Sequence, residues 1–158
     1  MGGKFPVLFK INSEDFLDGG LSVEEMLQVV SSLEKAGVDA IELSGGTKLS
    51  GKCIPIRKGE ITSREKEGYY REAAKRYRQR TNLPLILAGG IRSYEVAEEL
   101  LEHGLADYIS LCRPLIREPD LIKRWKSGDA RKAACLSDNY CITPVLKGKG
   151  LRCRNTAS

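Results

Sequence analysis

Long hydrophobic runs are absent from this sequence of 158 residues. No apolar stretch approaches the roughly 20 residues that a membrane-spanning helix needs, so we expect no membrane association. A secretory signal is also not recognisable, because Met1-Gly2-Gly3-Lys4 leads directly into a short apolar run. The balance of 41% hydrophobic and 30% charged residues is typical of a soluble globular domain. These features predict a cytoplasmic protein.

Histidine is nearly absent, and the excess of positive charge is small. The only histidine, His103, lies before Gly104 at the end of a predicted helix. A cation there complements the helix dipole, which favours a surface role over catalysis. The formal net charge is +5, but the basic residues are mixed with acids, as in Glu72-Ala73-Ala74-Lys75-Arg76. This mixture predicts solvated helix faces and no nucleic-acid partner.

The cysteine count is odd, which disfavours a disulfide framework. Without a sign of secretion, free thiols or metal ligands are the better interpretation. The five cysteines are Cys53, Cys112, Cys135, Cys141 and Cys153.

Four predicted strands alternate with four predicted helices. Ser22 with Glu25, and Thr62 with Glu65, are capping boxes that predict two helix starts. Ser93 predicts the start of a third helix, which ends at Gly104. A short fourth helix is predicted at 119–126, and buried strands are predicted at 6–12, 38–43, 83–88 and 107–111.

This alternation predicts an α/β fold with a parallel sheet. The segments around Asp39 and Asp107 resemble each other and lie 68 positions apart, which equals two strand–helix units. That repeat favours half of a TIM (β/α)8 barrel over a doubly wound sheet. We predict four βα units over residues 1–128, followed by a cysteine-containing tail at 129–158.

Half of a barrel leaves two sheet edges open. A complete barrel needs about 250 residues, and four parallel strands cannot close on themselves. Open edges expose unpaired backbone groups. We therefore expect pairing with a complementary half-barrel, pairing with a second copy, or an open sheet.

Candidate anion-binding residues follow the last two strands. In barrels of this kind the functional site lies at the carboxyl ends of the strands, and phosphate is often bound after the last two of them. Gly89-Gly90 would let backbone N–H groups approach an anion, and Arg113 could pair with phosphate oxygens. The alternative is a simple tight turn, with Arg113 paired to a surface carboxylate.

Four ordered segments resemble the NADH:flavin oxidoreductase (old yellow enzyme) family. They resemble the fifth to eighth strands of its FMN-binding barrel, so the chain corresponds to the C-terminal half. The segments are residues 9–12 together with 15–21, residues 36–46, residues 87–92, and residues 107–121.

The resemblance implies FMN as the cofactor and assigns residues to it. Lys10 corresponds to the basic residue beside the pyrimidine end of the isoalloxazine, where a cation favours negative charge on the reduced flavin. Ser44 and Gly45 would border the flavin or the substrate. The residues that correspond to the phosphate site are Gly89, Gly90, Cys112 and Arg113.

The resemblance also implies an activity, in which NAD(P)H reduces FMN and hydride passes to an activated alkene or a similar acceptor. The family's substrate-binding His/Asn or His/His pair and its proton-donating Tyr belong to the N-terminal half. No catalytic residue can therefore be assigned in this chain. The alternatives are a non-catalytic flavin- or phosphate-binding fragment and a half-barrel that self-associates without ligand.

The tail resembles the iron–sulfur segment of larger relatives, in which four cysteines hold a [4Fe–4S] cluster. Here Asp138 replaces one thiolate beside Cys135, Cys141 and Cys153, whereas four thiolates are the rule. A tail of free thiols is the alternative, and zinc is disfavoured because no histidine lies nearby. We favour no metal site and keep these four residues as the iron–sulfur candidates.

Overall fold

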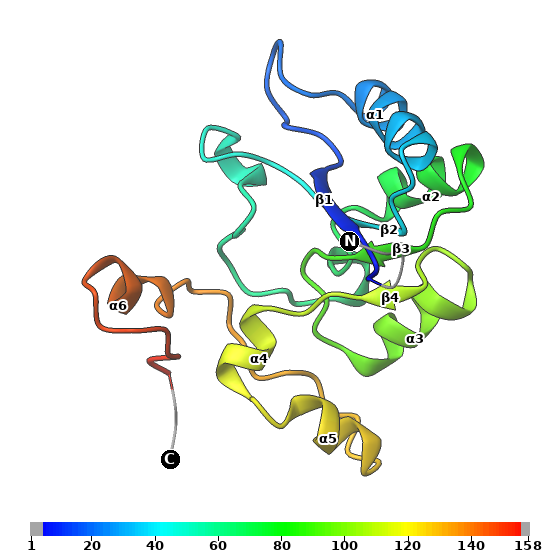
Figure 1. The fold of residues 1–158 in the computed structure, drawn as a ribbon. Coiled ribbons are helices and arrows are strands. Elements are labelled where there is room, and N and C mark those ends of the chain that lie inside the picture. Colours follow the sequence, from blue (N-terminus) through cyan, green and yellow to red (C-terminus); the bar gives the residue numbers. More distant parts are fainter. Residues whose placement is uncertain (1–4, 156–158) are drawn as a thin grey trace.

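The computed structural model describes residues 5–155. Its four strands form one parallel sheet in the order β1-β2-β3-β4 (Figure 1). The strands are β1 (Leu8–Asn12), β2 (Ala40–Ser44), β3 (Leu85–Leu87) and β4 (Tyr108–Ile109). The helices are α1 (Val23–Lys35), α2 (Arg71–Arg80), α3 (Tyr94–Glu102), α4 (Arg113–Arg117), α5 (Leu121–Lys126) and α6 (Ile142–Leu146), with short 3₁₀ turns at Gly51–Cys53 and Arg64–Lys66. Within 5–155, none of the helices is long and apolar enough to cross a membrane.

The core lies between one face of the sheet and the helices α1, α2 and α3. Ile41 pairs with Leu85 and Leu43 pairs with Leu87, and all four side chains are fully buried. They pack against apolar residues of the helices, which include Met26, Val30, Tyr77, Val96 and Leu100. The predicted alternation of strands and helices with a parallel sheet is confirmed.

The other face of the sheet is open. Because side chains alternate along a strand, Lys10, Glu42, Ile86 and Tyr108, which follow one another in the strand register, share this second face. Tyr108 is 61% exposed. In a complete barrel this face would line the interior, so the open face is what half of a barrel should present.

β1 is not the buried strand that its sequence predicts. Leu8 is 53% exposed and Phe9 is 41% exposed. The reason is its position, since β1 lies at the edge of the sheet and pairs only with β2. The apolar composition of the segment therefore predicts a strand but does not predict its burial, because an edge strand among the described residues has a neighbour on one side only.

The helix starts are predicted with mixed success. At α1 the capping box is present, because the Ser22 side chain accepts from the Glu25 amide and the Glu25 carboxylate accepts from the Ser22 amide. The capping box predicted at Thr62 and Glu65 is wrong, because α2 begins only at Arg71. Gly68, with a φ of +64°, interrupts the chain before the helix.

Glu67 supplies the physical reason for this late start. Its carboxylate is buried and accepts hydrogen bonds from the amides of Arg92 and Ser93, at 2.6 and 2.9 Å. Ser93 begins α3 as predicted, yet its hydroxyl donates to Glu67 instead of capping the helix. The segment before α2 is therefore held by a tertiary contact that no local pattern indicates.

The C-terminal third contains two helices that were not predicted. α4 and α6 are only five residues long, too short for a periodic pattern, whereas the predicted helix at 119–126 is confirmed as α5. His103 is the exposed C-cap of α3, which agrees with its predicted surface position.

The sequence repeat has a structural counterpart at the amino ends of the strands. The Asp39 carboxylate accepts from the amide of Val7, before β1, and the Asp107 carboxylate accepts from the amide of Leu85, at the start of β3; both distances are 2.6 Å. Each aspartate thus joins the start of its own strand to the preceding strand.

Candidate functional site

A groove of about 240 Å³ lies at the carboxyl ends of the strands, and we call it the strand-end groove. It contains six of the seven residues predicted to bind FMN. Its lining consists of Lys10, Glu42, Ser44, Pro55, Ile56, Tyr70, Ala88, Gly89, Gly90, Ile91, Arg92, Ser110, Leu111, Cys112, Arg113 and Pro114. The seventh predicted residue, Gly45, lies beside the groove, where its carbonyl accepts from the buried Tyr70 hydroxyl at 2.8 Å.

One side of the strand-end groove is the open face of the sheet. Lys10 Nζ donates to Glu42 Oε1 at 2.7 Å, and Ser110 Oγ donates to the same oxygen at 2.9 Å. The Lys10 side chain is 60% exposed and that of Glu42 is 24% exposed. Lys10, the cation predicted to lie beside the flavin, is therefore paired with Glu42, a carboxylate that no sequence pattern indicated.

Four of the residues that line the groove have backbone N–H groups without an acceptor in the described part of the chain. The amides of Gly89, Gly90, Cys112 and Arg113 donate to no acceptor among residues 5–155. Backbone N–H groups normally find acceptors, and four that lack one around a single groove form a ready site for an anion. These residues therefore fit a phosphate group.

The two glycines of the turn after β3 also have a packing role. They have φ values of +113° and +75°, and an added Cβ at Gly89 or Gly90 would lie 2.7 Å from the Tyr70 ring or 2.4 Å from the Tyr69 ring. Tyr70 is buried, and this burial raises the pKa of its hydroxyl. The tight-turn interpretation is therefore supported, and anion binding by the same turn stays a prediction.

Arg113 is buried, and the rest of the chain holds its side chain. Its Nη1 donates to the carbonyl of Arg57 at 2.9 Å and to the side-chain carbonyl of Asn139 at 2.6 Å. In the described part of the chain it pairs with no carboxylate. The predicted alternative, a pair with a surface carboxylate, is thus not what the structure shows.

Two residues of the tail form hydrogen bonds to residues that line the groove. No sequence pattern indicated this role. Asn139 also donates to the carbonyl of Ile56 at 2.7 Å, and Ser137 accepts from Arg92 at 3.0 Å. Arg92 is 3% exposed, and this burial lowers the pKa of its guanidinium. The left-handed backbone of Ser137 and Asn139, with φ of +56° and +64°, is invisible in the sequence.

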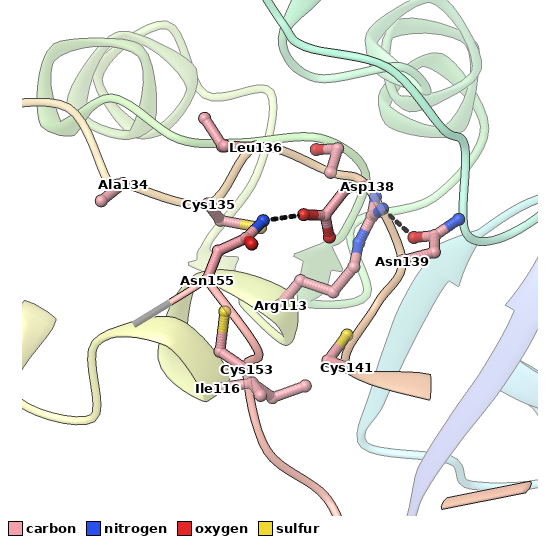
Figure 2. Close-up of a pocket in the computed structure, with 11 residues that line it drawn as sticks. Arg113, Ile116, Ala134, Cys135, Leu136, Asp138, Asn139, Cys141, Cys153 and Asn155 are labelled. Atoms are coloured by element: carbon pink, nitrogen blue, oxygen red, sulfur yellow. Dashed lines mark hydrogen bonds between the residues drawn. The ribbon is translucent and has the colours of Figure 1, made fainter. Parts of the chain in front are cut away.

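The four iron–sulfur candidates line a second, much smaller cavity of about 10 Å³, which also touches Arg113 (Figure 2). Asp138 accepts from the Tyr140 amide at 3.0 Å and from the Asn155 side chain. Within residues 5–155, no three His, Cys, Asp or Glu side chains are placed so that they could hold a metal ion. The structure thus gathers Cys135, Asp138, Cys141 and Cys153 but offers no support for a cluster.

The family model described as "NADH:flavin oxidoreductase / NADH oxidase family" matches residues 1–132. The chain belongs to this family. The resemblance seen in the four strand segments is therefore confirmed.

Curated relatives agree with this assignment. The chain is 32% identical to an NADH oxidase of Thermoanaerobacter brockii, over 97% of the chain and 23% of that protein. It is 26% identical to a 4,4'-dithiodibutanoate disulfide reductase of Rhodococcus erythropolis, over 93% of the chain and 43% of that protein. It is 31% identical to an NADPH dehydrogenase of Geobacillus thermodenitrificans, over 72% of the chain and 31% of that protein.

Solved structures show the same fold. A 2-naphthoyl-CoA reductase in complex with 2-naphthoyl-CoA matches with a TM-score of 0.69 and 24% identity, over 87% of this chain and 20% of that chain. Morphinone reductase matches with a TM-score of 0.53 and 22% identity, over 80% of this chain and 30% of that chain. These matches confirm the predicted fold class, half of a TIM barrel. The chain spans less than half the length of the relatives it matches.

Proposed function

We propose that this chain is the FMN-binding half of an NAD(P)H-dependent oxidoreductase whose acceptor is an activated alkene or a similar compound. The observation that supports this most is the strand-end groove. It combines four amides that have no acceptor among residues 5–155, the Arg113 guanidinium and the Lys10 ammonium in one place. The family to which the chain belongs consists of flavin-dependent oxidoreductases.

The residues of the groove fit the two ends of FMN. The amides of Gly89, Gly90, Cys112 and Arg113 would bind the phosphate, with Arg113 adding a charge-assisted hydrogen bond. Lys10 would lie beside the isoalloxazine, and Ser44 and Gly45 would border it. When bound, FMN supplies two-electron transfer between the nicotinamide and the acceptor.

The chain itself supplies binding and electrostatics. Lys10, on the open face, stabilises negative charge, and the buried core beneath the groove keeps the turns after β3 and β4 in place. No substrate-binding pair or proton donor is assigned in this chain, because the family's residues for those roles belong to the other half of the barrel.

A complementary half-barrel or a second copy of the chain would close the sheet. β1 and β4 are open edges, and the side chains of Phe5, Leu8 and Tyr108 are 81%, 53% and 61% exposed. Closure would cover these apolar groups and turn the open face into a barrel interior. In this proposal residues 1–128 form the half-barrel domain, and residues 129–158 form the tail.

The same exposed edges favour the second candidate function, a half-barrel that self-associates and either binds flavin without turnover or binds no ligand. The visible absorption spectrum of the purified chain, recorded after addition of FMN and gel filtration, separates these functions. A flavin spectrum that bleaches with NADH or NADPH supports the oxidoreductase, and a spectrum that does not bleach supports binding alone. Protein that stays colourless, also with a complementary half present, contradicts the FMN site.

Two arginines of α4 provide a matched test of the phosphate assignment. Arg113→Ala removes a guanidinium from the groove, whereas Arg117→Ala removes one from the same helix outside it. We expect Arg113→Ala to raise the Kd for FMN about 10- to 100-fold, since a hydrogen bond to a charged group contributes roughly 1.5–3 kcal/mol. Arg117→Ala should leave the Kd unchanged. Equal Kd values for Arg113→Ala and the wild type would contradict the assignment.

A further inference from the structure

Glu42 is the only carboxylate among the residues that line the strand-end groove. It lies in the middle of β2 and shares the open face of the sheet with Lys10, its partner in the strand register. We propose that Glu42 is a positioning residue that acts through Lys10. Its charge offsets that of the ammonium and thereby lowers the reduction potential of FMN bound here. This inference rests on the proposed function, because it concerns the same site.

The contacts of Glu42 show that its charge is fixed in place. Oε1 accepts from Lys10 Nζ at 2.7 Å and from Ser110 Oγ at 2.9 Å, so residues of β1 and of the segment after β4 converge on one oxygen. The position inside the groove distinguishes Glu42 from a carboxylate that pairs on a helix surface, such as Glu72.

The other cations of the groove do not replace Lys10 at this position. Arg113 is engaged by the carbonyl of Arg57 and by Asn139, and Arg92 is engaged by Ser137 and by the carbonyl of Ile91. Both arginines lie toward the tail, whereas Lys10 and Glu42 lie on the sheet. With the isoalloxazine beside Lys10 as proposed, the local charge would be set by one ammonium and one carboxylate, which nearly cancel.

The sign of the effect follows from electrostatics. Two-electron-reduced FMN carries negative charge near N1 and O2, which an uncompensated ammonium would favour. A carboxylate at hydrogen-bond distance from the ammonium opposes this stabilisation of reduced FMN. Closure of the barrel would exclude water and strengthen the effects of both the ammonium and the carboxylate. Removing the Glu42 charge should thus favour reduced FMN, and removing the Lys10 charge should disfavour it.

The test is the reduction potential of FMN bound to the chain, measured by equilibration with a reference dye. We expect Glu42→Gln to increase the affinity for reduced FMN relative to that for oxidised FMN about tenfold. This change raises the reduction potential by about 30 mV for a two-electron couple. Lys10→Met should shift the ratio about tenfold in the opposite direction. The double variant restores net neutrality and should fall within about threefold of the wild type.

The double variant separates charge compensation from a merely structural role. If Glu42 only holds the Lys10 side chain in position, Glu42→Gln has no effect once Lys10 is gone, and the double variant matches Lys10→Met. Glu42→Asp keeps the charge and should stay near the wild type. Glu72→Gln is the matched control, because Glu72 pairs with Lys75 at 2.8 Å, close to the 2.7 Å of the Lys10–Glu42 pair, on the exposed face of α2 and outside the groove.

The outcomes distinguish this inference from the proposed function. If the chain takes up no FMN, the proposed function is wrong and this inference falls with it. If FMN binds but Glu42→Gln has the wild-type potential, or a lower one, only the role of Glu42 is overturned. Should Glu42→Gln not fold, Lys10→Met and Glu42→Asp decide, because the inference requires a lowered potential in the first and an unchanged one in the second.

Discussion

The two ends of the same four strands differ in how their polar groups are satisfied. At the amino ends, Asp39 and Asp107 accept from the amides of Val7 and Leu85, and Asp107 also pairs with Arg78. At the carboxyl ends, the amides of Gly89 and Gly90 have no acceptor in the described chain. At the amino ends the protein itself supplies the acceptors, whereas the carboxyl ends carry the proposed FMN site.

This difference agrees with the proposal that the amino end serves stability and the carboxyl end serves binding. In barrels, residues at the amino ends of the strands serve the fold, and those at the carboxyl ends serve function. Substitutions at the two ends should therefore separate into effects on unfolding and effects on FMN binding.

The largest difference in the free energy of unfolding is expected between alanine substitutions at two glycines with positive φ. Gly46, after β2, has a φ of +81°, and a Cβ added there would lie 1.9 Å from the Cys53 carbonyl oxygen. Gly104, before β4, has a φ of +66° with no atom within 4 Å of such a Cβ. Gly104→Ala should cost about 1–2 kcal/mol from backbone strain alone. Gly46→Ala should cost more than about 3 kcal/mol, because backbone must also move.

Urea unfolding of the two variants checks this contrast. Losses of equal size would mean that the loop after β2 is not packed as closely as the structure shows.

Asp107 is the next contact to remove. Burial raises its pKa, but the hydrogen bonds from Arg78 and from the Leu85 amide outweigh this and leave the pKa below its ordinary value of 3.8. Asp107→Ala should reduce the free energy of unfolding by about 1–2 kcal/mol, since the carboxylate is partly exposed and screened. FMN affinity should not change.

The pH dependence of this loss has a defined sign. Because the pKa is lowered in the folded protein, the contribution of Asp107 is complete above its unfolded value of 3.8 and disappears as the pH falls through the folded value. The gap between wild type and Asp107→Ala should therefore narrow in acid. Asp120→Ala, at an exposed aspartate, is the control, and a gap that widens in acid would contradict the assignment.

A substitution of Asn139 should change FMN binding at the carboxyl ends of the strands and leave the contacts at their amino ends intact. Its side chain joins Arg113 to the carbonyl of Ile56. Asn139→Ala should raise the Kd for FMN about 3- to 10-fold, because the Arg113 guanidinium loses one of the groups that orient it. Isothermal titration with FMN measures the effect. It should vanish in an Arg113→Ala background, and full additivity would show that Asn139 acts elsewhere.

The smallest effects should come from two tyrosine hydroxyls. Tyr70 donates to the Gly45 carbonyl beside the groove, and Tyr77, two turns further along the chain, donates to the Leu83 carbonyl at the amino end of β3. Each Tyr→Phe change should cost about 1 kcal/mol of stability. Only Tyr70→Phe should also alter the visible spectrum of bound FMN. A spectral change in Tyr77→Phe would contradict the separation of binding and stability between the two ends of the strands.

The sequence by itself determined the elements whose signals are local. The Ser22–Glu25 capping box, the apolar strands and the repeat around Asp39 and Asp107 each depend on neighbouring residues or on chain period, so they could be predicted. They were enough for the half-barrel. The positions of Lys10, Ser44, Gly89, Gly90, Cys112 and Arg113 at strand ends were enough to place them in one groove, because parallel strands end at the same edge.

Only the tertiary structure decided which side chains meet across that groove. Glu67 delays the start of α2 by bonding to residues 92 and 93, Glu42 reaches Lys10 and Ser110, and Asn139 returns from the tail to Arg113. These pairs are separated by between 25 and 68 positions in the chain. A contact of that separation depends on how elements pack and leaves no periodic or local trace, so no pattern in the sequence could have specified it.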